Sequence, residues 1–195
     1  MTVVQILRIW LASIILSNFT PERMHPNNEE LQQAHIEYVN EVVKDIQIII
    51  YDPLYTPWFG GKWGRAQDAA LVAIISSEES GGYRPKVVTG KKRGDNGSSW
   101  CMMSLNIGKG KTPQGWTGSE LITDRHKCLL VGIHAMHQSM NACRRYGTLS
   151  GLSIYNTGRC IQGERISVFR ISRALYKVNK NVPTDNEVMK EYPFN

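Results

Sequence analysis

Apolar side chains recur every three or four residues along much of the chain, and this spacing indicates helices with one buried face. The longest such stretch begins near Asn28 and ends at Asp52-Pro53. The positions of its expected buried face are Leu31, His35, Val39, Val42, Ile46 and Ile49. We therefore predict a long helix here, followed by a loop over residues 53–64 that is rich in proline, glycine and aromatic residues.

Two further apolar stretches predict core helices. Val3 to Leu16 is interrupted by Gln5 and Arg8 and is short for a bilayer span, so we expect a buried helix, no membrane span and no secretory signal. Lys62 to Glu78 offers small apolar residues that allow close packing, so we place this helix at the centre of the domain. Ser80-Gly81-Gly82 ends it.

The second half of the chain alternates loops and helices. Within the glycine-rich segment 83–116, the strand candidates are Val87–Thr89 and Met102–Ile107. A capping box, Thr117 with Glu120, predicts the start of one long helix that continues to Cys143, with Gly147 as its C-terminal cap. A loop from Leu149 to Gly163 leads to a last helix, whose apolar positions are Val168, Ile171, Leu175 and Val178.

These elements predict an α+β fold of mainly helical character with a small β-rich insertion. The chain of 195 residues is the size of one domain. We divide it into an N-terminal helical segment (1–60) packed on the domain, a main domain (61–182) and a C-terminal tail (183–195). Hydrophobic residues make up 42% and charged residues 21%, which excludes a disordered chain and a fibrous protein.

Charge is distributed unevenly along the chain. Residues 1–60 carry seven acidic and three basic side chains, whereas residues 61–195 carry ten acidic and twenty basic ones. The basic part predicts an anionic partner, either a nucleic acid or a bacterial wall polymer. Arg170, Arg173, Lys177 and Lys180 recur at helical spacing, and we interpret them as a solvated basic stripe. No nucleic-acid motif accompanies them, so no nucleic-acid partner is expected.

Four cysteines permit two disulfide bonds. Cys128 and Cys143 are 15 residues apart in the predicted helix, about 22 Å at 1.5 Å per residue, so they cannot pair with each other. Of the two remaining pairings we expect Cys101–Cys128 and Cys143–Cys160, because each then ties a loop to one end of that helix. Disulfides without a secretory signal favour a protein that works outside the cytosol, such as a phage particle component.

The candidate chemistry begins at Glu78-Glu79-Ser80, where an apolar helix meets a glycine-rich loop. A carboxyl group in apolar surroundings keeps its proton more readily, which suits a general acid. Successive helix residues point about 100° apart, so at most one of the two carboxylates faces a cleft. The alternative is a pair of exposed carboxylates at a helix end.

Three segments together resemble the lysozyme-like superfamily, in its soluble lytic transglycosylase and goose-type lysozyme branch. Glu79-Ser80 matches the Glu-Ser that ends a helix in that branch. Cys101-Met102-Met103-Ser104 stands where the family has a Gly-Leu-Met-Gln strand, and Tyr155-Asn156-Thr157-Gly158 matches its Tyr-Asn-x-Gly motif. The resemblance covers roughly residues 65–180, so it makes segment 61–182 a lysozyme-like catalytic domain.

The resemblance implies cleavage of the β-1,4 bond between N-acetylmuramic acid and N-acetylglucosamine in peptidoglycan, with Glu79 as the single catalytic acid and no cofactor. Asp95 is the candidate second carboxylate for hydrolysis, unless it only forms an Asx-turn. The implied substrate-binding residues are Ser80, Met103, Ser104, Tyr155 and Asn156. We expect Glu79 to lie among the apolar groups of Ile75, Met103 and Tyr155.

Two alternatives come from other classes of protein. One is a non-catalytic virion or wall-binding protein with this fold, and the other is a cell-wall peptidase that pairs Cys101 with His126 or His134. His134 and His137 lack the spacing of a metal motif, so no metal site is expected. The expected partners are peptidoglycan strands and other virion proteins. The expected location is extracellular or virion-associated, with action in the bacterial wall (periplasm).

Overall fold

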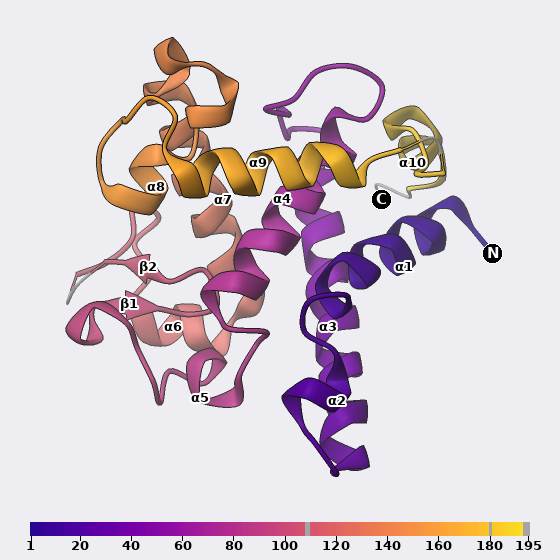
Figure 1. Cartoon of the computed structure of the whole chain (residues 1–195), viewed down its shortest axis with the longest axis vertical. Coiled ribbons are helices and arrows are strands. Elements are labelled where there is room, and N and C mark those ends of the chain that lie inside the picture. Colours follow the sequence, from indigo (N-terminus) through magenta and orange to yellow (C-terminus); the bar gives the residue numbers. More distant parts are fainter. Residues whose placement is uncertain (108–109, 180, 193–195) are drawn as a thin grey trace.

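A computed structural model describes residues 1–107, 110–179 and 181–192. The fold is mainly helical with one small sheet, as predicted (Figure 1). Its α-helices are α1 (Val3–Leu16), α2 (Pro21–Met24), α3 (Glu29–Ile50), α4 (Gly64–Glu79), α5 (Pro85–Val88), α6 (Gly118–Thr123), α7 (Arg125–Ala142), α8 (Ser153–Thr157), α9 (Arg165–Lys177) and α10 (Asp185–Glu191). Its strands are β1 (Ser99–Trp100) and β2 (Leu105–Asn106), and its 3₁₀ turns are η1 (Asp95–Gly97), η2 (Arg144–Tyr146) and η3 (Thr148–Ser150).

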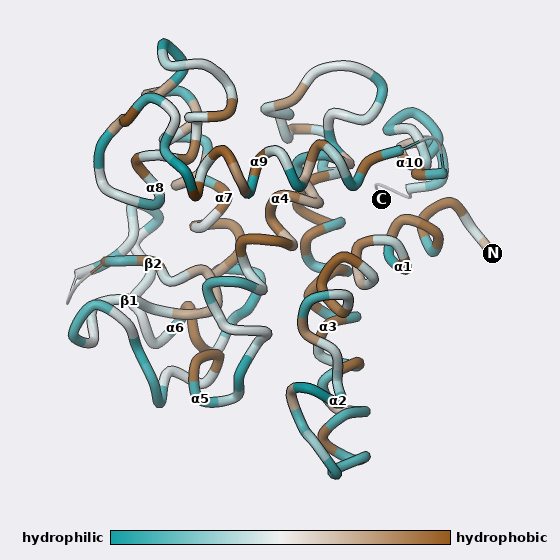
Figure 2. The backbone as a smooth tube through the Cα atoms, viewed as in Figure 1, coloured by the Kyte–Doolittle hydropathy of each residue, from teal (hydrophilic) through white to brown (hydrophobic). Residues whose placement is uncertain are grey.

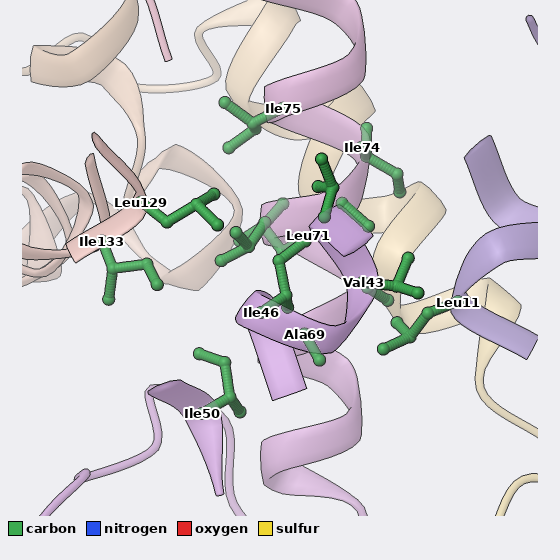
Figure 3. Packing of buried hydrophobic residues seen from close by; sticks show 14 of the residues in the cluster. Leu11, Val43, Ile46, Ile50, Ala69, Leu71, Ile74, Ile75, Leu129 and Ile133 are labelled. Carbon is green, nitrogen blue, oxygen red and sulfur yellow. The ribbon is translucent and has the colours of Figure 1, made fainter. Parts of the chain in front are cut away.

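Helix α4 forms the centre of the molecule, as the small residues in its sequence predict. It contacts α1, α3, α9 and α10, and it is buried almost all round from Ala66 to Ser77. Figure 2 shows it largely brown, whereas the exposed α2 is largely teal. Figure 3 shows Leu71, Ile74 and Ile75 of α4 among apolar side chains of α1, α3 and α7. Because α4 is buried on nearly all sides, tertiary packing stabilises it more than its own helix propensity does.

Helix α1 is the predicted core helix. Leu7, Leu11, Ile14 and Ile15 are buried, and α1 packs against α3 and α4. By length and composition alone, the segment Val3–Met24 is apolar enough to cross a membrane. Most of that segment's surface is not buried within the fold, although the side chains that face α3 and α4 are.

The glycine-rich segment differs from the prediction in detail. Val87 and Val88 belong to the short helix α5, because Pro85 occupies its first turn, where proline is favourable. The predicted strand over 102–107 contracts to β2, which pairs antiparallel with β1 in the register Ser99–Asn106 and Trp100–Leu105. The intervening residues form a turn in which Cys101 has positive φ.

The predicted long helix from Thr117 is two helices. The capping box of Thr117 and Glu120 is formed, but α6 ends at Thr123. Asp124 then adopts an extended backbone conformation and caps α7, accepting a hydrogen bond from the Lys127 amide at 3.0 Å. Helix α7 ends before Cys143, so Gly147 follows the turn η2 and does not cap the helix.

Both predicted disulfide bonds are present. Cys101–Cys128 joins the turn between β1 and β2 to the first part of α7, and Cys143–Cys160 joins the end of α7 to the segment after α8. The first bond holds the turn against α7, where the buried Met103 packs over Gly132. A Cβ on Gly132 would lie 2.6 Å from the Met103 side chain, so glycine is required for this close approach.

The predicted C-terminal tail contains α10, which packs on α1. Its first residue, Asp185, accepts hydrogen bonds from the Arg65 amide (2.8 Å) and the Ala66 amide (3.2 Å) at the start of α4. Trp63, at the N-cap of α4, makes no side-chain capping bond. A carboxylate from the other end of the chain therefore caps the central helix.

Candidate active site

Glu79 is the last residue of α4, at the end of the central helix. The Gly82 amide donates to the Ser77 carbonyl at 2.7 Å, and Gly81 and Gly82 both have positive φ. A Cβ on Gly82 would lie 2.5 Å from the Phe19 ring, so only glycine fits this turn. The Glu79 side chain is 24% exposed, and it is therefore partly accessible from outside the core.

The nearest charged group to Glu79 is a guanidinium. Arg170 of α9 is 8% exposed, and its Nη2 lies 2.7 Å from Glu79 Oε1. The same guanidinium donates from Nε to Glu78 at 2.9 Å and from Nη1 to the Asn156 side-chain oxygen at 2.9 Å. The surroundings of Glu79 are therefore not purely apolar as expected, because a buried cation joins α4 to α9 at this point.

Arg173, one turn further along α9, forms an ion pair with Glu78. Glu78 therefore contacts two guanidinium groups, whereas Glu79 shares only Arg170. The expected solvated stripe is wrong for Arg170 and Arg173, which point toward the end of α4. Lys180, also assigned to that stripe, lies outside the described residues.

Asn156 connects this cluster to α9. Its amide donates to Glu164 at 2.9 Å while its oxygen accepts from Arg170. Glu164 also accepts from the amides of Ile166 and Ser167, which begin α9. Burial acts to raise the pKa of Glu164, but these hydrogen bonds outweigh it and lower that pKa below its usual range. Asn156 has no described hydrogen bond to Glu79 and is connected to it through Arg170, which contacts both residues.

Tyr155 lies beside Glu79. Its hydroxyl donates to the Met103 carbonyl at 2.6 Å. Burial and the negative charge of Glu79 raise the pKa of Tyr155. The Tyr155 hydroxyl therefore holds the backbone of the turn between β1 and β2 next to Glu79.

Glu79 borders a pocket of about 850 Å³, here called the Glu79 pocket, with Ser80 and Ser104 also in its lining. A neighbouring pocket of about 560 Å³ is lined by Asp95, Tyr155 and Asn156. Ser104 lines both, and its hydroxyl approaches the Glu79 carbonyl at 3.5 Å. Apart from Met103, the sequence-predicted site residues therefore line two adjoining hollows.

Two of the expected substrate contacts have other roles. Ser80 is buried, and its hydroxyl donates to the Ser76 carbonyl at 2.6 Å and accepts from the Tyr83 amide at 2.8 Å. The Met103 side chain is fully buried. Ser80 therefore stabilises the turn after α4 while it borders the pocket, and Met103 fills the core.

Asp95 is exposed in the turn η1, where its carboxylate accepts from the Ser99 hydroxyl. It lines the neighbouring pocket and not the one that Glu79 borders. Asp95 therefore lies in a local turn, but the Gly97 amide donates to the Gly94 carbonyl, and the described hydrogen bonds do not include the expected Asx-turn. The Asp95 side chain still faces a hollow.

The cysteine–histidine alternative is wrong, because the Cys101 sulfur is bonded to Cys128 and no described cysteine is free. His137 packs against Trp58 with ring centroids 4.6 Å apart, and burial lowers its pKa. Among the described residues, no three His, Cys, Asp or Glu side chains gather closely enough to hold a metal ion.

Sequence reasoning missed Arg170 and Glu164 as members of the site. The buried residues of α9 include Ser167, Ile171 and Ala174. Arg170 is three residues from the first and four from the last, so helical spacing places it on this buried face. The position of Arg170 relative to the apolar residues of α9 was therefore the feature of the sequence that indicated a buried arginine.

No family model, no curated protein and no solved structure matches this chain. The mainly helical fold with a small sheet agrees with the predicted fold class. The lysozyme-like assignment stays a prediction from the three motifs.

Proposed function

We propose that this protein cleaves peptidoglycan between N-acetylmuramic acid and N-acetylglucosamine, as a lytic transglycosylase with Glu79 as its acid. The observation that carries the proposal is the position of Glu79, a partly exposed carboxylate beside a partly buried tyrosine at a pocket of about 850 Å³. Pockets of this size accommodate small ligands and short oligomers.

In the proposed reaction, the protonated Glu79 gives its proton to the glycosidic oxygen as the bond from that oxygen to C1 of the muramic acid breaks. The 6-hydroxyl of the same muramic acid then forms a bond to C1, and its proton passes to the Glu79 carboxylate. The products are an anhydro-sugar end and a free 4-hydroxyl. Glu79 is restored, so no second carboxylate and no water are consumed.

Arg170 sets the condition for this proton transfer. A carboxyl group that carries a proton gains little from a guanidinium partner, so Glu79 must part from Arg170 to act as an acid. Arg170 retains two other partners, Glu78 and Asn156, after such a separation. In the proposal, a bound sugar displaces the guanidinium from Glu79 without leaving it unpaired.

The test is digestion of purified peptidoglycan followed by mass spectrometry of the soluble products. We expect anhydro-muropeptides from the wild type and a loss of about 10² to 10⁴ in rate for Glu79→Gln, which keeps the shape and removes the transferable proton. Glu78→Gln is the matched control and should retain activity within about tenfold. Reducing ends in place of anhydro ends would assign hydrolysis and bring Asp95 into the reaction. An active Glu79→Gln variant refutes the assignment.

A second candidate, a non-catalytic virion or wall-binding protein, is favoured by the Glu79–Arg170 ion pair itself. In that case Glu79 serves only to hold α4 against α9. Peptidoglycan that sediments with the protein and releases no product would support this candidate. Unfolding measurements on the same Glu79→Gln sample would show whether the ion pair contributes to stability.

The proposed place of action is the bacterial wall, reached from outside the cell or from a virion. The two disulfide bonds are compatible with an oxidising compartment. The proposed partners are peptidoglycan strands and, in a particle, other virion proteins.

A further inference from the structure

Five basic side chains line the Glu79 pocket: Arg23, Arg84, Lys86, Lys92 and Arg93. All five are exposed. They come from two separate parts of the fold, α2 on one side and the segment around α5 on the other. These two parts lie apart at the lower end of Figure 1, and both contribute to the lining of the pocket.

The negative charge in the lining of the pocket is already paired with arginine side chains of α9. Its acidic lining residues are Glu78 and Glu79, which pair with Arg170 and Arg173. Within the described parts of the chain, no ion pair joins any of the five basic side chains to a carboxylate. A hollow lined by one sign of charge concentrates its field and attracts the opposite charge.

We infer that the Glu79 pocket binds glycan that carries anionic substituents, and that these substituents, held by the five basic side chains, place the sugar chain at Glu79. This inference rests on the proposed function. Arginine binds carboxylate and phosphate groups through two parallel hydrogen bonds, whereas a neutral sugar leaves the five cations uncompensated. The anions are either carboxylates of stem peptides or phosphates of wall polymers.

The lining favours a glycan over a single-stranded nucleic acid. Proteins that bind single strands stack the bases on aromatic side chains. No phenylalanine, tyrosine or tryptophan is among the described residues that line this pocket. Arg93, which lines it, instead covers the ring of Trp100 at 4.2 Å with its guanidinium.

Binding is tested with the Glu79→Gln protein, so that fragments stay intact, in titration calorimetry at low and high salt. The probes are peptidoglycan fragments with stem peptides, the same glycan with its stems removed, a glycerol phosphate polymer and a neutral N-acetylglucosamine oligomer. We expect the anionic probes to bind more tightly than the neutral oligomer, and their affinity to fall with salt. Tighter binding of stem-bearing fragments identifies carboxylates, and tighter binding of the polymer identifies phosphates.

The variant Arg23→Gln/Arg84→Gln/Lys86→Gln should weaken binding of the preferred anionic probe by about tenfold or more. The matched control is Lys44→Gln/Arg159→Gln/Lys190→Gln, which removes the same charge from exposed positions outside the pocket lining and should change affinity less than about twofold. Arg23→Gln alone, in the short α2, serves if the triple variant unfolds. It should weaken binding by about threefold.

Equal losses in the two triple variants, or equal affinity for the neutral oligomer, would overturn the inference. So would a single-stranded oligonucleotide that binds more tightly than every wall fragment and displaces them. Failure of the proposed function is distinguishable, because wild-type protein would then release no product from any glycan. Pocket-dependent binding of the anionic fragments would still establish the inference in that case.

Discussion

Arg170 and Glu79 form an ion pair of 2.7 Å that connects the end of the central helix α4 to α9. The guanidinium is 8% exposed and each carboxylate that it contacts is about a quarter exposed. A cation this deep in the fold requires its partners, because removing one side of a buried pair leaves the other uncompensated. Glu79 is also the proposed catalytic acid, so a change at this residue is expected to affect both stability and activity.

The first prediction concerns that contact. Arg170→Met should lower the free energy of unfolding by about 3 kcal/mol, because Glu78 and Glu79 both lose their buried partner. Arg173→Met is the control and should lower it by less, since Glu78 retains Arg170. Urea unfolding of both variants measures the difference. Equal losses would show that the buried guanidinium contributes no more than the outer one.

The second prediction concerns pH. Burial raises the pKa of Asp68 to about 7, although hydrogen bonds from the Tyr55 hydroxyl and from the amides of Trp58 and Phe59 act to lower it. The folded state therefore holds a proton that the unfolded state releases near pH 4. The contribution of the Asp68 carboxyl to the free energy of unfolding is fully present below pH 4 and is lost as the pH rises toward and through 7.

Asp68→Asn removes this dependence, because the amide does not titrate. Compared with the wild type, the variant should be relatively more stable at pH 7.5 than at pH 4. Urea unfolding at both pH values gives the two differences in free energy. A difference that does not change with pH contradicts the buried, protonated carboxyl.

The third prediction concerns the cap of α4. Asp185→Ala leaves the amides of Arg65 and Ala66 without their acceptor and should cost about 1 to 2 kcal/mol of stability. Glu187→Ala, on the exposed side of the same helix, removes only an exposed acceptor of the Thr184 amide and hydroxyl and should cost less than half as much. Thermal unfolding of the two variants distinguishes a structural role of α10 from that of a dispensable tail.

The fourth prediction concerns the disulfide bonds. Each closes a loop, of 27 residues for Cys101–Cys128 and 17 for Cys143–Cys160, and should stabilise the fold by about 3 kcal/mol. A peptide map without reductant should recover both linked peptide pairs. Replacing Cys143 and Cys160 together by alanine should lower stability by that amount, measured without reductant. A map with four free thiols would contradict the pairing.

Several features of the fold follow from local sequence. The spacing of apolar residues predicted α3 and α9, because a helix places every third or fourth side chain on one face and the core must cover that face. Continuous apolar or small residues predicted α1 and α4. The distance along a predicted helix excluded one cysteine pairing, and the expected pairing is present. The capping box at Thr117 is formed as its motif indicates.

Other features differ from what composition and spacing indicate, or depend on residues that are distant in the chain. Val87 and Val88 favour a strand by composition, yet Pro85 begins a helix there, and Asp124 interrupts the predicted long helix by capping a second one. The sequence by itself determined that α1, α3, α4 and α9 are helices and placed Glu79 beside the end of α4. Tertiary structure alone decided that Arg170 meets Glu79 and that Asp185 caps α4, because the packing of helices distant in the chain brings these charged groups together.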